Sequence, residues 1–202
     1  MRDHLQKYGT ALCTEIMNID AAEFERFLLL LKEAWRQDKQ VFILGNGGSA
    51  GTANHFVCDF GKNAVREPGK RRFRILSLAD NVERITAYGN DVDFSEIFRQ
   101  QMINLLNLGD VVIAVSASGN SPNLVRACEY AKEQGASVVA LAGMGGGAIS
   151  RLADAKLVTE MREYEPIEDY HLIILHMVVC YFKEHPEFLK CGEWNVESGV
   201  IV

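Results

Sequence analysis

The stretch VFILGNGGSA, residues 41–50, carries the clearest fold signal in this chain of 202 residues. Its first four residues form a short apolar run of the kind that is buried on both faces in a parallel sheet. Glycines follow at once and lead into a helical pattern that continues past His55. A strand that turns through glycines into a helix is typical of α/β proteins, so the stretch predicts a parallel sheet covered by helices.

The same alternation continues along the chain. Four more β-rich runs follow, with helix-patterned stretches between nearly all of them, at residues 73–78, 111–115, 137–142 and 156–159. We therefore predict an α/β fold, a three-layer sandwich in which helices cover both faces of a five-stranded parallel sheet. Ligands bind beyond the carboxyl ends of the strands in such sheets, so the loops there are the candidate sites.

Helical patterns also lie at both ends of the chain. Residues 3–37 place apolar side chains at helical spacing and predict two helices that separate near Asp20. Asp20 can cap the second of these helices, with Glu23 at the capping-box position. A last long helix is predicted from about Pro166 to Lys183, with the proline in its first turn.

Composition and charge exclude several classes of protein. Apolar residues make up 48% and charged residues 24%, as in a globular protein. The formal charge of −6 offers no general attraction to nucleic acid or to an acidic membrane, so neither is expected as a partner. The five cysteines are scattered, mostly within apolar runs, and predict reduced core thiols. With the charged start MRDHLQKYG, they favour a cytoplasmic location.

The glycine turn GNGGSA, residues 45–50, is a candidate phosphate site because backbone N–H groups converge on an anion at a helix N-terminus. It also fits the pattern GxGxxA, so a dinucleotide-binding turn is the alternative. Such a turn expects an acidic residue about 20 positions later. A basic loop stands there instead, and Asp80 comes thirty residues after Ala50, which favours a phosphate site.

The serine loop SASGNSP, residues 116–122, is the more specific candidate. Its three hydroxyls and its free N–H groups at a helix start can hold a phosphate monoester. Ser121 is also expected to cap the helix, with Pro122 at the first helical position. Two other loops are less informative: the glycines at 143–147 favour a flexible turn, and the basic loop at 62–74 is either a solvated loop or one wall of an anion pocket.

Four side chains on two predicted helices could carry chemistry. His55 and Asp59 are four residues apart, so they lie on one helix face. There they could bind a metal, act as a general acid and a general base, or form a local ion pair. Glu168 and His176 lie on the apolar flanks of the last helix, although a lone histidine in such a run is more often a core residue.

Four motifs stand out when taken together: GNGGSAGTANHF, YGND at 88–91, SASGNSPN and IEDYHLIILH. They resemble the SIS (sugar isomerase) domain, and within it the sedoheptulose 7-phosphate isomerases. The resemblance implies a flavodoxin-like sheet preceded by N-terminal helices, and aldose–ketose isomerisation of sedoheptulose 7-phosphate through an enediol. Two alternatives are a hexose or pentose phosphate as substrate, and a non-catalytic SIS protein of the replication-initiator-associating type that binds a sugar phosphate or a protein.

The resemblance also assigns roles. It implies Asp59 as the catalytic base and His176 as the acid, and a divalent metal site formed by His55, Asp59, Glu168 and His176, with zinc first and manganese, nickel or iron as alternatives. Aspartate replaces the family's glutamate at Asp59, and glutamate replaces its glutamine at Glu168. The implied substrate-binding residues are Asn46, Gly47, Gly48, Ser49, Asn90, Asp91, Ser116, Ala117, Ser118, Ser121 and Glu168.

Assembly follows from the same resemblance. Family members form tetramers with active sites at subunit borders, so we expect a homotetramer in which residues 1–38 serve oligomerisation, residues 39–186 form the SIS domain and residues 187–202 form a tail. Glu168 and His176 are eight residues apart, about 12 Å along a helix. They can share one ion only if it sits midway or if different subunits contribute them.

Overall fold

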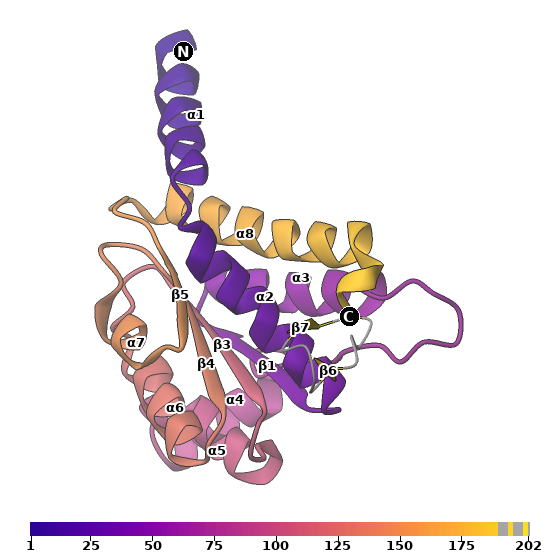
Figure 1. The fold of residues 1–202 in the computed structure, drawn as a ribbon. Helices are drawn as coiled ribbons and strands as arrows, with labels where there is room; N and C mark the ends of the chain where they lie inside the picture. The colour runs from indigo at the N-terminus through magenta and orange to yellow at the C-terminus, as the bar shows by residue number, and fades with distance from the viewer. Residues whose placement is uncertain (190–193, 196–199, 202) are drawn as a thin grey trace.

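A computed structural model describes residues 1–189, 194–195 and 200–201 and contains the predicted five-stranded sheet. All neighbouring strands are parallel, in the order β2-β1-β3-β4-β5, and each strand begins and ends within one residue of its predicted bounds (Figure 1). This is the flavodoxin-like order, in which the loops after β1 and β3 face each other where the winding reverses. The strands are β1 (Gln40–Gly45), β2 (Arg74–Ser77), β3 (Val111–Ser116), β4 (Ser137–Ala142) and β5 (Ala155–Val158).

Helices cover both faces of the sheet and complete the predicted three layers. Successive strand residues are buried on opposite faces: Val41 and Ile43 belong to one apolar core, and Phe42 and Leu44 belong to the other. The first core is shared with α2 (Ala21–Arg36), α3 (Gly48–Asn63) and α8 (Tyr164–Glu184). The second is shared with α4 (Val82–Asp91), α5 (Ile97–Leu105), α6 (Pro122–Glu133) and α7 (Gly147–Leu152).

The two N-terminal helices separate at Asp20, as predicted. The Asp20 carboxylate accepts the backbone N–H groups of Ala22 at 2.9 Å and Glu23 at 3.2 Å, which caps α2. The Glu23 carboxylate accepts the backbone N–H of Lys156 in β5 at 2.8 Å and a bond from Arg26. These bonds tie α2 to the edge of the sheet.

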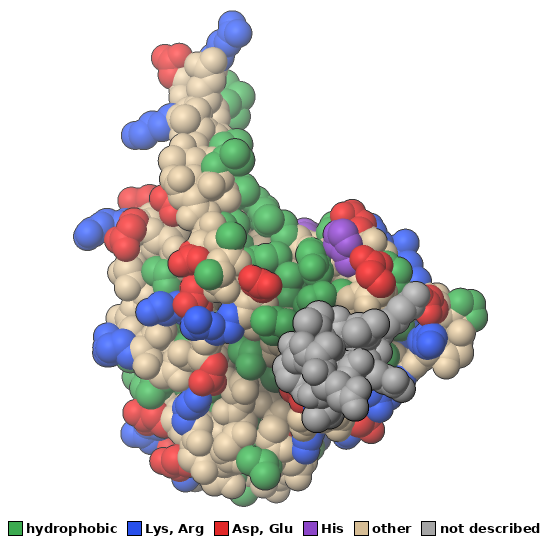
Figure 2. Space-filling view, in the orientation of Figure 1, with side chains coloured by type: hydrophobic (Ala, Val, Ile, Leu, Met, Phe, Trp, Pro, Cys, Tyr) green, Lys and Arg blue, Asp and Glu red, His purple; other side chains and the backbone are tan. Residues whose placement is uncertain are grey.

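Helix α1 (Arg2–Met17) projects from the body of the molecule (Figure 1). It has no buried residue, and Leu5 and Met17 are 64% and 84% exposed. Figure 2 shows hydrophobic side chains along one side of this helix. Two side-chain hydrogen bonds link it to the body: the Tyr8 hydroxyl donates to Asp169 at 2.6 Å, and Glu15 accepts from Thr159 at 2.6 Å.

Helices α3 and α8 lie side by side and run in the same direction. Gly48 at the start of α3 contacts Glu168 near the start of α8, and Ala64 just beyond α3 lines one pocket with Phe182 near the end of α8. Helix α8 starts two residues before the predicted Pro166, which stays in the first turn. The other elements are η1 (Phe94–Glu96), η2 (Pro186–Leu189) and the antiparallel pair β6 (Trp194–Asn195) and β7 (Val200–Ile201).

The predicted core thiols are wrong for most of the cysteines. Cys128 is buried, but Cys13, Cys58 and Cys180 are exposed free thiols, because apolar neighbours in the sequence do not decide which face of an amphipathic helix a residue occupies. Cys191 lies outside the described residues. Within the described part of the chain, no helix is both long enough and apolar enough to cross a bilayer.

Candidate active site

The loops after β1 and β3 meet in one pocket at the carboxyl edge of the sheet. The pocket has a volume of about 110 Å³. Asn46 in the glycine turn and Asn123 at the start of α6 connect the two loops, since each side-chain amide donates to the other at 2.9 Å. The predicted residues that line the pocket are Asn46, Ser49, Ser116, Ala117, Ser118, Ser121 and Glu168; Val115 and Tyr164 line it as well.

The hydroxyls of the serine loop keep donor capacity for a ligand. Ser116 Oγ accepts the backbone N–H of Gly119 at 3.0 Å, and Ser118 Oγ accepts that of Asn120 at 3.3 Å. Ser121 occupies the N-cap position of α6, but its side chain makes no capping hydrogen bond. The prediction that Ser121 caps the helix is therefore wrong for its hydroxyl, which lines the pocket instead. All three O–H groups remain available to donate to an anion.

The glycine loop after β4 supports the serine loop. A Cβ on Gly119 would lie 2.0 Å from the carbonyl oxygen of Gly146, so the two backbones touch at a position that only glycine permits. The Gly119 carbonyl accepts the N–H of Ile149 at 3.0 Å, and Asn120 Oδ1 accepts that of Ala148 at 3.0 Å. The expected flexible turn is thus packed against the phosphate-site candidate, and its glycines serve this contact.

Glu168 closes the pocket from α8. Its carboxylate lies against the first residue of α3, since a Cβ on Gly48 would come within 2.2 Å of Oε2. A carboxylate at a helix N-terminus is stabilised by the helix dipole. Glu168 therefore belongs with the predicted substrate-binding residues in space.

The predicted catalytic and metal-binding side chains of α3 and α8 form a second cluster. His55 Nε2 lies 3.2 Å from Asp59 Oδ2, His176 Nε2 lies 3.5 Å from the same oxygen, and the two histidine nitrogens lie 3.0 Å apart. All three side chains are open to solvent, with 50%, 33% and 43% of their areas exposed for His55, Asp59 and His176.

This triangle of atoms fits a divalent metal ion. Ligands at about 2.0–2.1 Å from a tetrahedral ion lie about 3.4 Å from one another, close to the observed 3.0, 3.2 and 3.5 Å. Two imidazoles and one carboxylate are a common ligand set for catalytic zinc, which keeps a fourth position open. The solvent-exposed side of the cluster provides that position.

Glu168 was predicted for the metal site but lies outside this cluster, and Asn90 and Asp91 were predicted to bind substrate but lie outside the serine pocket. Among the described residues, the group whose ligand atoms come within 4.8 Å of one another contains His55, Asp59 and His176, without Glu168. Asn90 and Asp91 stand at the end of α4, where Asn90 Nδ2 donates to Asp91 Oδ1 at 2.8 Å. Neither lines the serine pocket in this chain.

Three further residues of this region were not singled out by sequence patterns. Tyr164 lines the serine pocket, and Asn123 pairs with Asn46, which no spacing rule relates to it. His171 is fully buried in α8, and neither ring nitrogen has a hydrogen-bond partner of ordinary geometry. Burial lowers its pKa to about 4, although the neighbouring backbone of Ala142 acts in the opposite direction. His171 is therefore the neutral core histidine of α8.

Comparison with known proteins gives the family. The sequence profile of the SIS domain matches residues 4–143. Phosphoheptose isomerase from Geobacter sp. (strain M21) is 36% identical over 166 residues, which are 82% of this chain and 85% of that protein. Its counterpart from Pelobacter propionicus is 37% identical over 148 residues, or 73% of this chain and 77% of its own length.

A solved structure agrees with these sequences. Phosphoheptose isomerase GmhA from Neisseria gonorrhoeae superposes with a TM-score of 0.79 at 25% identity, over 91% of this chain and 96% of its own. The shared fold thus extends well beyond the segment matched by the domain profile. The chain belongs to the SIS domain family and, within it, to the phosphoheptose isomerases.

Proposed function

We propose that this protein is a sugar-phosphate isomerase that interconverts sedoheptulose 7-phosphate and the corresponding aldose heptose 7-phosphate through an enediol. The observation that carries the proposal is the cluster of His55, Asp59 and His176, beside a hydroxyl-lined pocket, in a chain of the phosphoheptose isomerase family. A carboxylate and an imidazole at hydrogen-bond distance are the groups that proton transfer between two carbons requires.

The serine pocket is the proposed phosphate site. Ser116, Ser118 and Ser121 supply O–H donors, and the starts of α3 and α6 supply the favourable ends of two helix dipoles. Phosphate is held there by neutral donors, because Lys and Arg are absent from the residues that line the pocket within the described chain. Asn90 and Asp91 stay proposed substrate contacts, supplied by a second copy of the chain.

The two clusters lie at different heights on α3. His55 is seven residues from Gly48, about 10 Å along the helix, and Asp59 is eleven residues from it, about 16 Å. A sugar phosphate held by its phosphate in the serine pocket would therefore extend along α3 to bring its reacting carbons to Asp59.

The two oxygens of Asp59 can serve different roles. Both histidine contacts use Oδ2, which leaves Oδ1 to remove a proton from C1 of the ketose and return it to C2 of the enediol. While its Nε2 carries no metal, His176 moves the hydroxyl proton between O1 and O2. The Asp59 side chain is one methylene shorter than the glutamate that the family has at this position, so the substrate must approach α3 more closely.

We also propose that His55, Asp59 and His176 hold a divalent metal, zinc first. Such an ion would polarise the carbonyl and stabilise the enediolate charge. Glu168 is eight residues from His176, about 12 Å along α8. We therefore propose that Glu168 binds the substrate in its own subunit. It could be a fourth metal ligand only for the metal site of a neighbouring subunit.

A homotetramer in the cytoplasm completes the proposal. Exposed apolar residues on the projecting helix α1 and an open catalytic cluster both favour assembly. Replacing Leu5 and Met17 by lysine is expected to yield smaller assemblies in sedimentation velocity, whereas Leu108→Lys, an exposed residue distant from α1 in the sequence, serves as the control. An unchanged sedimentation coefficient in the double variant would refute the role of α1.

The experiment that tests the reaction uses purified protein, sedoheptulose 7-phosphate and zinc or manganese in deuterated water. The enediol route predicts that the aldose product carries deuterium at C2, as detected by NMR. Asp59→Asn and His176→Gln are expected to lose nearly all turnover while still binding the sugar phosphate. No turnover by the wild-type protein, with intact sugar binding, would favour the non-catalytic SIS alternative.

A further inference from the structure

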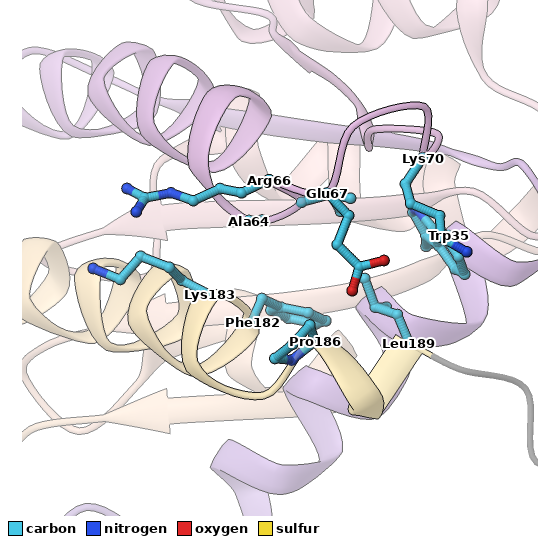
Figure 3. Close-up of a pocket in the computed structure, with 10 residues that line it drawn as sticks. Trp35, Ala64, Arg66, Glu67, Lys70, Phe182, Lys183, Pro186 and Leu189 are labelled. Atoms are coloured by element: carbon cyan, nitrogen blue, oxygen red, sulfur yellow. The ribbon is translucent and has the colours of Figure 1, made fainter.

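A second pocket lies at the opposite end of α3 and α8 from the serine pocket. It has a volume of about 280 Å³, and none of its lining residues also lines the serine pocket. Because α3 has 16 residues, the two pockets are about 20 Å apart along its axis. Apolar side chains form the walls (Figure 3): Trp35 from α2, Ala64 and Val65 after α3, Phe182 near the end of α8, and Pro186 and Leu189 from η2.

Contacts around the pocket hold its walls in place. The indole N–H of Trp35 donates to the carbonyl oxygen of Arg71 at 2.8 Å, and the Arg71 guanidinium lies 5.2 Å from the centre of the indole ring. Phe182 packs edge-to-face on Phe60 and Phe73, with ring centres 5.5 and 5.3 Å apart. The basic loop is thereby fastened to α2, and the pocket is formed before any ligand arrives.

Positive charge dominates the rim. Arg66, Lys70 and Lys183 line the pocket against a single carboxylate, Glu67. In Figure 3, Arg66 and Lys183 extend at one end, Lys70 lies beside Trp35 at the other, and Glu67 reaches between them. The chain as a whole carries −6, so this local excess of cations is opposite in sign to the protein's net charge and creates a local attraction for anions.

We propose that this pocket binds a small planar aromatic anion, specifically an aryl carboxylate. A cavity of about 150 Å³ takes up benzene, so about 280 Å³ has room for two fused rings. The rings would pack against Trp35, Phe182 and Leu189, while the carboxylate lies toward the Lys183 ammonium group at one end of the rim and Lys70, at the other end, adds to the positive potential. This site uses none of the residues of the proposed isomerase reaction.

The test is a calorimetric titration of the full-length protein with 2-naphthoate and with its neutral analogue 2-naphthamide. We expect 2-naphthoate to bind at least about threefold more tightly than the amide, since each screened charge contact at a surface changes affinity by a few fold. Lys183→Glu and Lys70→Glu should each weaken 2-naphthoate binding by about threefold or more. Glu67→Gln should strengthen it, an effect that a misfolded variant cannot produce.

Lys156→Glu is the matched control, because this exposed lysine lies on β5 and outside the pocket. It makes the same charge change and should leave the affinity as it is. Any of these outcomes would overturn the proposal: no binding of 2-naphthoate at millimolar concentration, equal affinities for the acid and the amide, or unchanged binding in the Lys183→Glu variant. A Glu67→Gln variant that binds 2-naphthoate more weakly would also overturn it.

Discussion

Asn46 and Asn123, 77 residues apart in the chain, exchange two hydrogen bonds of 2.9 Å between their side-chain amides. The pair spans the point where the winding of the sheet reverses and holds the glycine turn against the serine loop. Asn123 is 2% exposed and Asn46 is partly buried, so the pair is partly screened from water and its bonds are strengthened by the lower local dielectric. The shape of the proposed phosphate site depends on this pair.

Asn123→Ala is therefore expected to raise KM for the sugar phosphate about tenfold, because it frees the glycine turn and leaves the Asn46 amide unpaired. The value of kcat should change much less, since Asp59 and His176 lie on other helices. Steady-state kinetics provide the measurement, and Asn104→Ala, which removes an exposed amide that donates to Tyr88 at 3.4 Å, is the control. Equal losses in kcat and KM for Asn123→Ala would contradict the positioning role.

Gly48→Ala tests the contact between α3 and Glu168. The new methyl group would displace the Glu168 carboxylate, which lies within 2.4 Å of that position. A flexible side chain can rotate away, and alanine favours a helix by about 0.5–1 kcal/mol, so the free energy of unfolding should change by less than about 1 kcal/mol. KM should rise about fivefold because the carboxylate leaves the pocket.

Gly51→Ala is the matched control for this substitution. A Cβ on Gly51 meets nothing within 4 Å, so this variant should be slightly stabilised, with an unchanged KM. If Glu168 carries the effect, Gly48→Ala should add little to Glu168→Ala in a double-mutant cycle. Additive effects on KM would show that the methyl group itself blocks the substrate.

The metal site predicts a specific stoichiometry. Zinc-reconstituted protein should hold about one ion per chain, and His55→Ala should lose it, because two ligands bind far more weakly than three. Glu168→Gln should keep the ion, since its carboxylate lies by Gly48 rather than by His176. Metal analysis after gel filtration decides between the two sets of ligands: loss of zinc from Glu168→Gln would mean that a neighbouring subunit supplies Glu168.

His171 should make the fold sensitive to acid. Its pKa is about 4 in the folded chain and about 6.5 when unfolded. Between these values the unfolded chain binds a proton that the folded chain does not, so stability falls by about 3 kcal/mol as the pH drops from 7 to 4 and is unaffected above pH 7. Urea denaturation at several pH values measures this loss.

His171→Leu should flatten that part of the pH profile at little cost near neutral pH, because the ring nitrogens form no hydrogen bond of ordinary geometry. His4→Leu, which removes an exposed histidine from α1, should leave the profile unchanged. An equally steep loss of stability in wild type and His171→Leu would assign the acid sensitivity to other groups.

The sequence alone was sufficient to predict the sheet and most of the residues that line the serine pocket. Apolar runs such as residues 41–44 are buried on both faces, which requires helices on both sides, and a glycine or serine turn after a strand has to lie at its carboxyl edge. Local chemistry therefore placed Asn46, Ser116 and Ser118 at one edge of the fold. Spacing also placed His55 and Asp59 on one face of α3, since that relation is internal to a helix.

Sequence patterns did not predict the side-chain contacts between different helices and strands. No spacing rule relates Asn46 to Asn123 or Gly48 to Glu168, and only the resemblance to the SIS family joined Asp59 to His176, because these pairs form when β1, β3, α3 and α8 pack together. The faces that Cys58, Cys180 and His171 occupy were likewise settled by packing. Periodicity specifies the backbone of each element, whereas the side-chain contacts that create a site depend on how neighbouring elements are rotated and aligned, and only the tertiary structure determines that.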